Sequence, residues 1–288
     1  GLLFALVAAM LWLITSVYSV GYMRAGSYPN QTGYFASFAV CVSATVGLAF
    51  AANLLTFFLF YEVLTLATYP LVAHNRTASA RAGGRKYLVY TLTAGQVLLL
   101  AIVWIHSLVP GGEFQAGGML PPGTPSWTTT ALFVLFVVGI GVKAGIMPLH
   151  AWLPAAMVAP TPVSALLHAV AVVKAGVFAI LKVTIYVFGL DLVSENGASN
   201  WLLWVAAGTI LIASLIALQQ DNLKKRLAYS TISHLSYVVL GALMANAAGI
   251  IGGAMHIATH AFGKICLLYT SDAADEGLGV DLGGRRII

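Results

Sequence analysis

Ionisable side chains occur within segments of this sequence that are otherwise almost wholly apolar. Residues 137–178, VVGIGVKAGIMPLHAWLPAAMVAPTPVSALLHAVAVVKAGVF, contain Lys143 and Lys174. Glu62 stands in the middle of a second apolar stretch, LTFFLFYEVLTLATYPLV. Burial favours the neutral form of each group, whereas a partner of opposite charge favours the charged form. Groups held near that balance exchange protons close to neutral pH, so these residues indicate proton transfer.

A second motif combines histidine and lysine. The segment MHIATHAFGKI spaces His256, His260 and Lys264 at i, i+4 and i+8, which places them on one face of a helix. Imidazole both donates and accepts hydrogen bonds, so this stripe suits a proton wire. Two alternatives remain: a hydrogen-bonded packing role, and a metal site that no nearby cysteine or acid completes. His234, in the preceding predicted helix, is a weaker candidate for the same polar axis.

Two prolines, Pro148 and Pro154, follow Lys143 in the sequence. Proline removes a backbone donor and clashes with the preceding turn, so we expect a broken helix around Pro148. Membrane transporters place ion sites at such breaks. The next predicted helix carries His168 and Lys174 on one broad face, about 120° apart around its axis.

Together these residues suggest a lateral proton relay. Lys143 is expected to pair with Glu62 across two helices, and to swing toward Lys174 and release its proton there, because like charges disfavour each other. The relay then continues to His260 and Lys264. In the competing interpretation a hydroxyl or backbone carbonyl satisfies Glu62, and Lys143 snorkels to the membrane surface.

The composition indicates an integral membrane protein. Hydrophobic residues make up 60% of the 288 residues and charged residues 8%, against roughly 25% charged residues in a soluble domain. Lipid can solvate that apolar excess. The two cysteines suggest no disulfide framework. The sequence has no nucleotide-binding loop, nucleophile elbow or cysteine cluster, so we expect no cofactor and no nucleic-acid partner.

Apolar runs predict an all-α polytopic protein with about nine transmembrane helices in a lipid bilayer. The first residues contain no basic region and no initiator methionine, which suggests a segment from within a longer protein rather than a signal peptide. The predicted spans are about 2–20, 34–51, 54–72, 87–107, 128–149, 162–188, 200–218, 227–246 and 249–265.

The loops between these spans divide by charge. The loops on one side, which we call side A, include 73–86 and 219–226 and carry eight Lys or Arg residues and one acid. The loops on the opposite side B include 108–126 and 190–199 and carry three acids and no Lys or Arg. The positive-inside rule makes side A cytoplasmic. Lys182 lies near side B, where we expect it to snorkel, and it is left out of the site.

The last residues differ from the rest of the sequence. Residues 266–288, CLLYTSDAADEGLGVDLGGRRII, change from apolar to acidic, then glycine-rich, then basic. They resemble the in-frame translation of a sequencing adapter, so we expect a non-native tail and the native segment to be 1–265.

Four segments resemble one protein family: FYEVLTLATYPLV, GVKAGIMPLHAWLPAAMVAPTPVSALLHA, DNLKKRLAYSTISHLSY and HAFGKI. They are similar to the antiporter-like membrane subunits of respiratory complex I and to the large A and D subunits of Mrp-type Na+/H+ antiporters. The resemblance covers nearly all of residues 1–265.

The resemblance implies a core with two inverted five-helix repeats, each with a discontinuous helix. Residues 34–188 match the first repeat and 200–265 the start of a truncated second repeat. The family's relay positions match Glu62, Lys143, Lys174 with nearby His168, and the stripe His256, His260 and Lys264. The family's exit-side lysine or glutamate lies further on, so we do not expect residues 1–265 alone to conduct.

The resemblance also implies a function and partners. Family members move protons, or exchange protons for a monovalent cation such as Na+, within multi-subunit membrane complexes. We expect this chain to lie in a bacterial or archaeal cell membrane. The segments VVKAGVF and HAFGKI favour the D-type or free-standing antiporter relatives. The alternative is a redox-driven subunit of an NADH-quinone oxidoreductase or a hydrogenase-type relative. Two other classes remain: a membrane haem protein using His168, His256 and His260, and a purely structural subunit.

Overall fold

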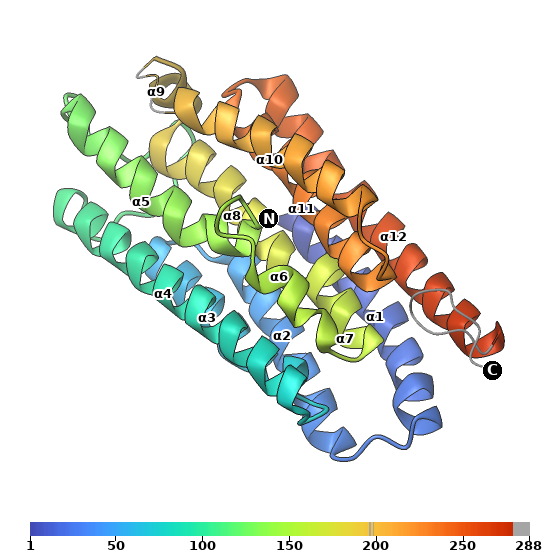
Figure 1. Cartoon of the computed structure of the whole chain (residues 1–288). Coiled ribbons are helices and arrows are strands. Elements are labelled where there is room, and N and C mark those ends of the chain that lie inside the picture. The colour runs from blue at the N-terminus through green and yellow to red at the C-terminus, as the bar shows by residue number, and fades with distance from the viewer. Residues whose placement is uncertain (196, 198, 279–288) are drawn as a thin grey trace.

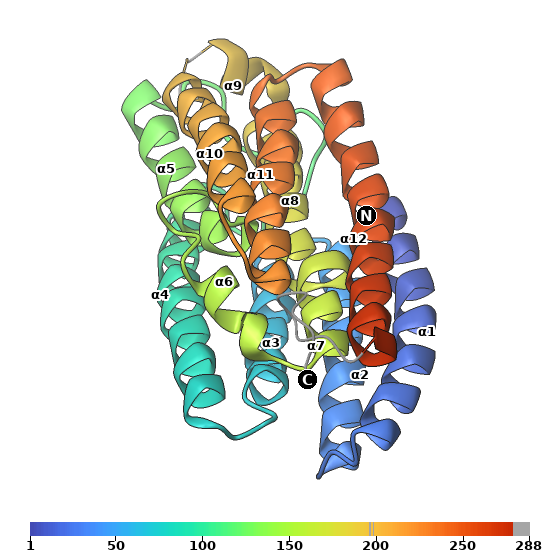
Figure 2. The ribbon, with the colours of Figure 1, turned by 45° about the vertical axis from the view of Figure 1, so that its right-hand side comes forward.

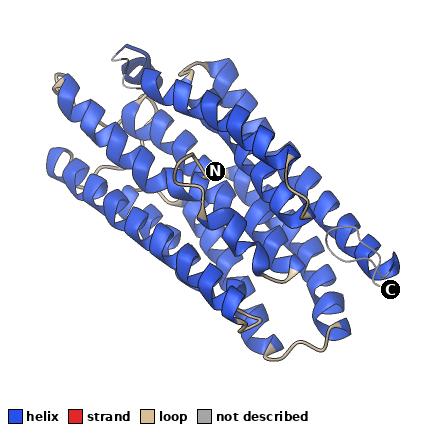
Figure 3. Ribbon diagram, in the orientation of Figure 1, coloured by secondary structure: helices blue, strands red, loops and turns tan. Residues whose placement is uncertain are grey.

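The computed structural model describes residues 1–195, 197 and 199–278 of the chain, and in this part the named elements are all helices (Figure 3). The long helices run up and down a bundle in which consecutive helices are mostly antiparallel (Figure 1). Their bounds are α1 Leu2–Ala25, α2 Gln31–Phe50, α3 Leu54–Val72, α4 Ala78–Leu108, α5 Ser126–Ala144, α10 Asn200–Leu218, α11 Leu223–Leu243 and α12 Ala247–Leu278.

One further span is composite. It consists of α7 Thr161–Ala165, a π-helical segment Leu166–Val170, α8 Val172–Val183 and a second π-helical segment Thr184–Phe188. Every residue from 161 to 184 is buried, and α5, α11 and α12 all contact this span. It is therefore the central element of the bundle, so a polar side chain on it faces protein rather than lipid.

Eight of these spans are long and apolar enough to cross a membrane, counted over the described residues. The ninth predicted crossing is α11, which begins with two lysines and an arginine and carries several polar side chains. It nevertheless packs between α10 and α12 along their length (Figures 1 and 2). The all-α polytopic fold is confirmed. Helix α11 can be less apolar than the other spans because its neighbours cover much of its surface.

Two helices begin earlier than predicted because a side chain caps them. Helix α4 begins at Ala78 rather than 87, because the Thr77 side chain accepts a hydrogen bond from the backbone N–H of Ala80 at 3.1 Å and so caps the helix. Helix α11 begins at Leu223 rather than 227 for the same reason, with Asn222 as the cap. The basic loops 73–86 and 219–226 are thus partly helical.

Helix α12 continues beyond the predicted end at 265. Leu268 is buried, and the ring of Tyr269 stacks on that of Tyr18 of α1 with 3.8 Å between centroids. Residues 266–270 are apolar enough to extend a packed helix, whatever their origin. The non-native tail stays a prediction, and its residues 279–288 lie outside the described part of the chain.

The predicted break near Pro148 occurs earlier, because α5 ends at Ala144, directly after Lys143. Gly145 adopts φ 75°, the left-handed conformation that closes many helix C-termini. After the turn come the short helix α6, Trp152–Ala155, which contains Pro154, and a 3-10 turn, Ala156–Val158. The span predicted as one helix, 162–188, is also interrupted, at Ala171 with φ −120° and ψ −74°.

Candidate functional site

Lys143 lies at the last turn of α5 and contacts α3. Its side chain is 1% exposed, and Nζ donates a hydrogen bond of 2.6 Å to the backbone carbonyl of Tyr61. The same ammonium lies 3.3 Å from the centroid of the Tyr61 ring. Snorkelling of Lys143 is therefore wrong, because the amine is directed into the bundle.

Glu62 follows Tyr61 on α3, but the predicted ion pair with Lys143 is not formed. Among the described residues, no carboxylate oxygen lies within 4.0 Å of Nζ, because Nζ is bound to the Tyr61 carbonyl instead. Glu62 is partly buried against Gly95 of α4, and its buried Oε1 has no hydrogen-bond partner in the described part of the chain. Pairing of the two groups requires a side-chain movement around Tyr61.

Two hydrogen bonds hold the break after Lys143, one within the α5–α6 region and one to α10. The indole N–H of Trp152 donates to the carbonyl of Val142 at 2.7 Å, which satisfies an acceptor that the helix end leaves open. The backbone N–H of Met147 donates to Oγ1 of Thr209 on α10 at 3.3 Å. The Lys143 backbone therefore sits at a fixed interruption, and Pro148 occupies the turn that follows.

Lys174 and His260 form the direct contact at the centre of the bundle. Nζ of Lys174, on α8, lies 2.5 Å from Nδ1 of His260, on α12. Both side chains are buried, at 1% and 7% exposure. When Lys174 is charged, Nδ1 accepts and the imidazole proton resides on Nε2, which is buried without a hydrogen-bond partner in the described residues. The predicted approach of these two residues is thus present.

His260 belongs to a group of three histidines, His234, His256 and His260, which we call the histidine cluster. Nδ1 of His234 lies 3.2 Å from Nε2 of His256, and the two rings stack with 5.3 Å between centroids. The ring of His234 lies 5.2 Å from that of His260. His234 carries only a weak signal in the sequence, since it is the single histidine of its predicted helix.

Lys264 continues the stripe on α12 toward side A. Its Nζ donates to Oγ of Ser230 at 2.9 Å and to the carbonyl of Leu227 at 3.3 Å, both on α11. The side chain is 4% exposed. Lys264 and the histidine cluster thus place their polar groups along the contact between α11 and α12.

His168 lies apart from the direct contacts of Lys174. It is buried in the π-helical segment 166–170, and its Nε2 lies 2.8 Å from Sδ of Met157. The interruption at Ala171 separates the two residues, so the single helical face predicted for them is not continuous. Single π-turns of this kind are frequent at functional sites.

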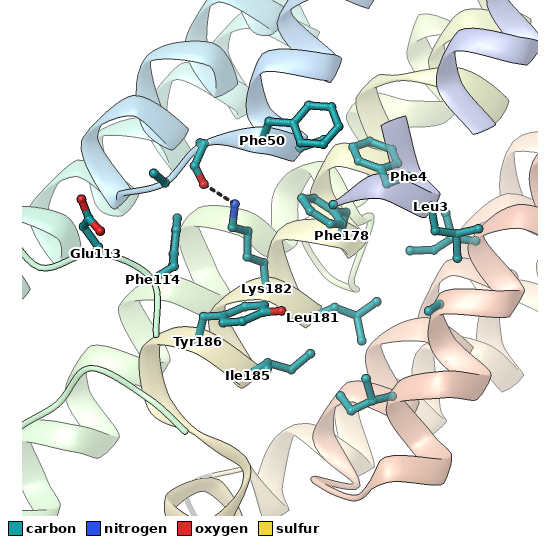
Figure 4. Close-up of a pocket in the computed structure, with 17 residues that line it drawn as sticks. Leu3, Phe4, Phe50, Glu113, Phe114, Phe178, Leu181, Lys182, Ile185 and Tyr186 are labelled. Carbon is teal, nitrogen blue, oxygen red and sulfur yellow. Dashed lines mark hydrogen bonds between the residues drawn. The ribbon is translucent and has the colours of Figure 1, made fainter. Parts of the chain in front are cut away.

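The expectation that Lys182 snorkels is wrong. Its side chain is 8% exposed, and Nζ donates a hydrogen bond of 2.6 Å to the carbonyl of Ala51 (Figure 4). The ammonium also lies 4.3 Å from the ring centroid of Phe114. Ala51 follows the last residue of α2, where carbonyls lack helical partners. Lys182 thus links the central span to this helix end, beside a cavity of about 450 Å³.

The structure therefore brings the predicted residues together as two groups. One comprises Glu62 and Lys143 around Tyr61, and the other comprises Lys174, Lys264 and the histidine cluster. The groups lie on packed helices, because Gly176 of α8 contacts the backbone of α5 at Lys143. The two amines nevertheless have partners on different helices: Lys143 binds a group on α3, and Lys174 binds a group on α12.

Comparisons with known proteins agree on a family. The family model described as NADH:quinone oxidoreductase/Mrp antiporter, transmembrane, matches residues 51–276. The chain is 31% identical over 99% of its length to the NAD(P)H-quinone oxidoreductase chain 5 of Picosynechococcus sp., of which it covers 43%. It is 31% identical over 85% of its length to a probable K(+)/H(+) antiporter protein of Rhizobium meliloti, of which it covers 24%.

A solved structure places the chain in the same family of proteins. A chain of the Mrp complex from Dietzia sp. superposes with a TM-score of 0.88 at 26% identity, over 96% of this chain and 30% of that one. The chain thus spans less than half the length of these relatives. The family match covers most of the chain, and the eight apolar spans make it an integral membrane protein. The chain therefore belongs to the NADH:quinone oxidoreductase/Mrp antiporter transmembrane family.

Proposed function

We propose that this chain is the proton-conducting membrane segment of an antiporter-like subunit in a multi-subunit complex. It moves protons, or exchanges protons for a monovalent cation, through a relay of buried Glu, Lys and His side chains. The family membership and the two polar groups inside the bundle support this function.

The contact between Lys174 and His260 carries the proposal. A buried lysine at hydrogen-bond distance from a buried imidazole can exist with its proton on either group. Ionisable residues within membrane spans are costly and normally mark ion pathways. The histidine cluster then offers adjacent sites to a proton that leaves Lys174, and Lys264 lies one turn further along α12.

The test replaces His260 in the complete protein within its native assembly. We expect His260→Ala to slow proton transfer by about a hundredfold, the order of magnitude lost with one positioned proton carrier, without preventing assembly. Thr259→Val is the matched control, because Thr259 is the neighbouring residue on the exposed face of α12. Wild-type proton transfer in a correctly assembled His260→Ala complex would show that the stripe only packs.

A second candidate function is redox-driven pumping. Several relatives are NAD(P)H-quinone oxidoreductase subunits, and a chain of an archaeal respiratory membrane complex shares the fold at a TM-score of 0.83. Relatives therefore come from both branches, and the partner subunits decide between them. Purification of the native assembly answers this question: co-purifying redox subunits would support the pump, and their absence would support the exchanger.

The same proposal covers the topology and the repeats. Residues 34–188 form the first repeat and 200–265 the start of the second. The loops 73–86 and 219–226 face the cytoplasm of a bacterial or archaeal cell, and the partners are other membrane subunits. The basic side-A loops support this orientation, although some relatives are chloroplast proteins.

A further inference from the structure

A cavity of about 280 Å³ lies at the side-A end of the bundle, away from the proposed relay. It is where the α1–α2 and α3–α4 connections approach each other, at the lower end of the molecule in Figure 2. Its lining comes from both connections and from the adjoining ends of α3 and α4: Pro29, Asn30, Tyr69, Pro70, Ala73, His74, Arg76 and Arg81.

Two arginines supply positive charge to this cavity. Nε of Arg81 donates a hydrogen bond of 3.1 Å to the backbone carbonyl of Arg76, which fixes Arg81 over the α3–α4 connection. Arg76 itself adopts φ 52°, an uncommon conformation for a residue with a side chain. In the described part of the chain neither guanidinium forms an ion pair with a carboxylate, so the protein leaves this charge uncompensated.

His74 forms a buried wall of the same cavity. It is 9% exposed, and its ring packs edge-on against that of Tyr34 with 5.3 Å between centroids. Its Nε2 has no hydrogen-bond partner among the described residues. Burial, together with the nearby charge of Arg76, lowers the pKa of His74, so the ring is neutral near pH 7. The other ring nitrogen donates to the backbone of Pro29, so Nε2 of the neutral ring is a hydrogen-bond acceptor. The charge of the cavity therefore comes from the arginines.

Helix ends add to the same electrostatic preference. The lining residue Asn30 directly precedes α2, and its side chain does not cap that helix. Arg76 and Arg81 flank the first residue of α4. The N-termini of helices favour anions, and phosphate is a common ligand of backbone N–H groups there. Arginine matches phosphate geometry through paired N–H donors.

The surface of α3 leads directly to this cavity. Leu55, Leu59 and Leu66 are exposed by 57–59% and lie on one face of the helix. The same face continues to the exposed Pro70, at the edge of the cavity. An apolar stripe that ends at uncompensated arginines matches a molecule with hydrocarbon chains and an anionic headgroup.

We propose that this cavity binds the phosphate group of an anionic phospholipid, with the acyl chains along the exposed face of α3. Basic pockets between transmembrane helices on the cytoplasmic side are suited to such headgroups, and each basic residue contributes about 1 kcal/mol near the surface. This site is independent of the proton relay, so either proposal can fail without the other.

The test measures lipid retention by the complete protein in its native assembly. The protein is purified in detergent and exposed to mixed micelles of a neutral and an anionic phospholipid, and bound lipid is quantified by native mass spectrometry. We expect the double variant Arg76→Gln, Arg81→Gln to bind the anionic lipid about thirtyfold more weakly than the wild type. Arg85→Gln is the matched control, because Arg85 is exposed one turn further along α4 and does not line the cavity.

One further outcome decides the source of the phosphate, and two others decide whether the site exists. Inorganic phosphate at millimolar concentration should not displace the lipid, because it lacks the acyl chains; displacement would overturn the lipid assignment in favour of a soluble phosphate ligand. Equal lipid retention by the wild type and a correctly assembled double variant would overturn the site itself. Weakening by Arg85→Gln equal to that of the double variant would also overturn it, because general surface charge would then explain the binding.

Discussion

At the scale of single residues, the structure replaces a predicted ion pair with a different arrangement. The amine of Lys143 is bound to a backbone carbonyl and an aromatic face of Tyr61, rather than to Glu62. The carbonyl accepts from an ammonium and from a neutral amine alike, whereas the aromatic face favours the ammonium, and no carboxylate among the described residues forms an ion pair with it. The site is therefore compatible with a lysine that gains and releases a proton.

We expect Lys143→Arg to be nearly as damaging to proton transfer as Lys143→Ala, with a loss of about a hundredfold in each. Arginine keeps the positive charge but does not release its proton. Proton transport by the assembled complex in vesicles measures the effect, with Lys225→Arg as the control on an exposed lysine of side A. Robust transport by the arginine variant would exclude deprotonation of Lys143 from the mechanism.

The position of His234 gives a second prediction at this scale. Its ring contacts both other members of the histidine cluster, so we expect His234→Ala to slow proton transfer by about tenfold or more. Tyr237→Phe serves as the control, because Tyr237 contacts the rings of His234 and His256 but is 48% exposed. If both variants transport at the wild-type rate, His234 is a packing residue only.

At the scale of the elements, the sequence predicted the spans better than their interruptions. Apolar runs and the basic loops placed the helices correctly, because lipid exposure requires long apolar segments. The prolines predict the break at Pro148, whereas α5 ends at Ala144 and Gly145 forms the turn. A glycine among many others carries little signal, since only the tertiary structure shows which one adopts positive φ. The interruption at Ala171 has no proline or glycine to mark it.

The glycine at the break can be tested directly. A methyl group at Gly145 would meet its neighbours at 3.6 Å or more, which is ordinary contact, so space is available. The φ of 75° is unfavourable for alanine, however, by about 1–2 kcal/mol. We therefore expect Gly145→Ala to lower the free energy of unfolding by that amount and to impair transport, because the turn positions Lys143.

The control for this variant is Gly208→Ala, in the interior of α10, where a methyl group meets no atom within 4 Å. Alanine is favoured over glycine in a helix, so this variant should be neutral or slightly more stable. Thermal unfolding of the purified proteins compares the two. Equal stability of both variants would show that the backbone at 145 relaxes, and that the turn is not needed to hold Lys143.

At the scale of the whole molecule, the distribution of charge predicts the orientation of the bundle. The side-A ends of the helices carry Arg and Lys residues in the first turns of α4 and α11, whereas the side-B connections carry acids. Because α11 crosses between α10 and α12, the chain changes side at each long helix and the two sets of loops stay separate. A bundle in which α11 did not cross would place the 219–226 loop and the α11–α12 connection on the same side.

Cysteine labelling of intact cells tests this orientation. Single cysteines at the exposed positions Ala78 and Lys225 should react only with a membrane-permeant reagent, since side A is expected to face the cytoplasm. Cysteines at Gln115 and Asp191, exposed on side B, should react with an impermeant reagent as well. Cys266 is exposed and must first be replaced by serine, whereas Cys41 is buried and can stay. Labelling of Ala78→Cys and Gln115→Cys from the same side would contradict the nine-crossing bundle, because α4 alone separates those two positions by one passage through the membrane.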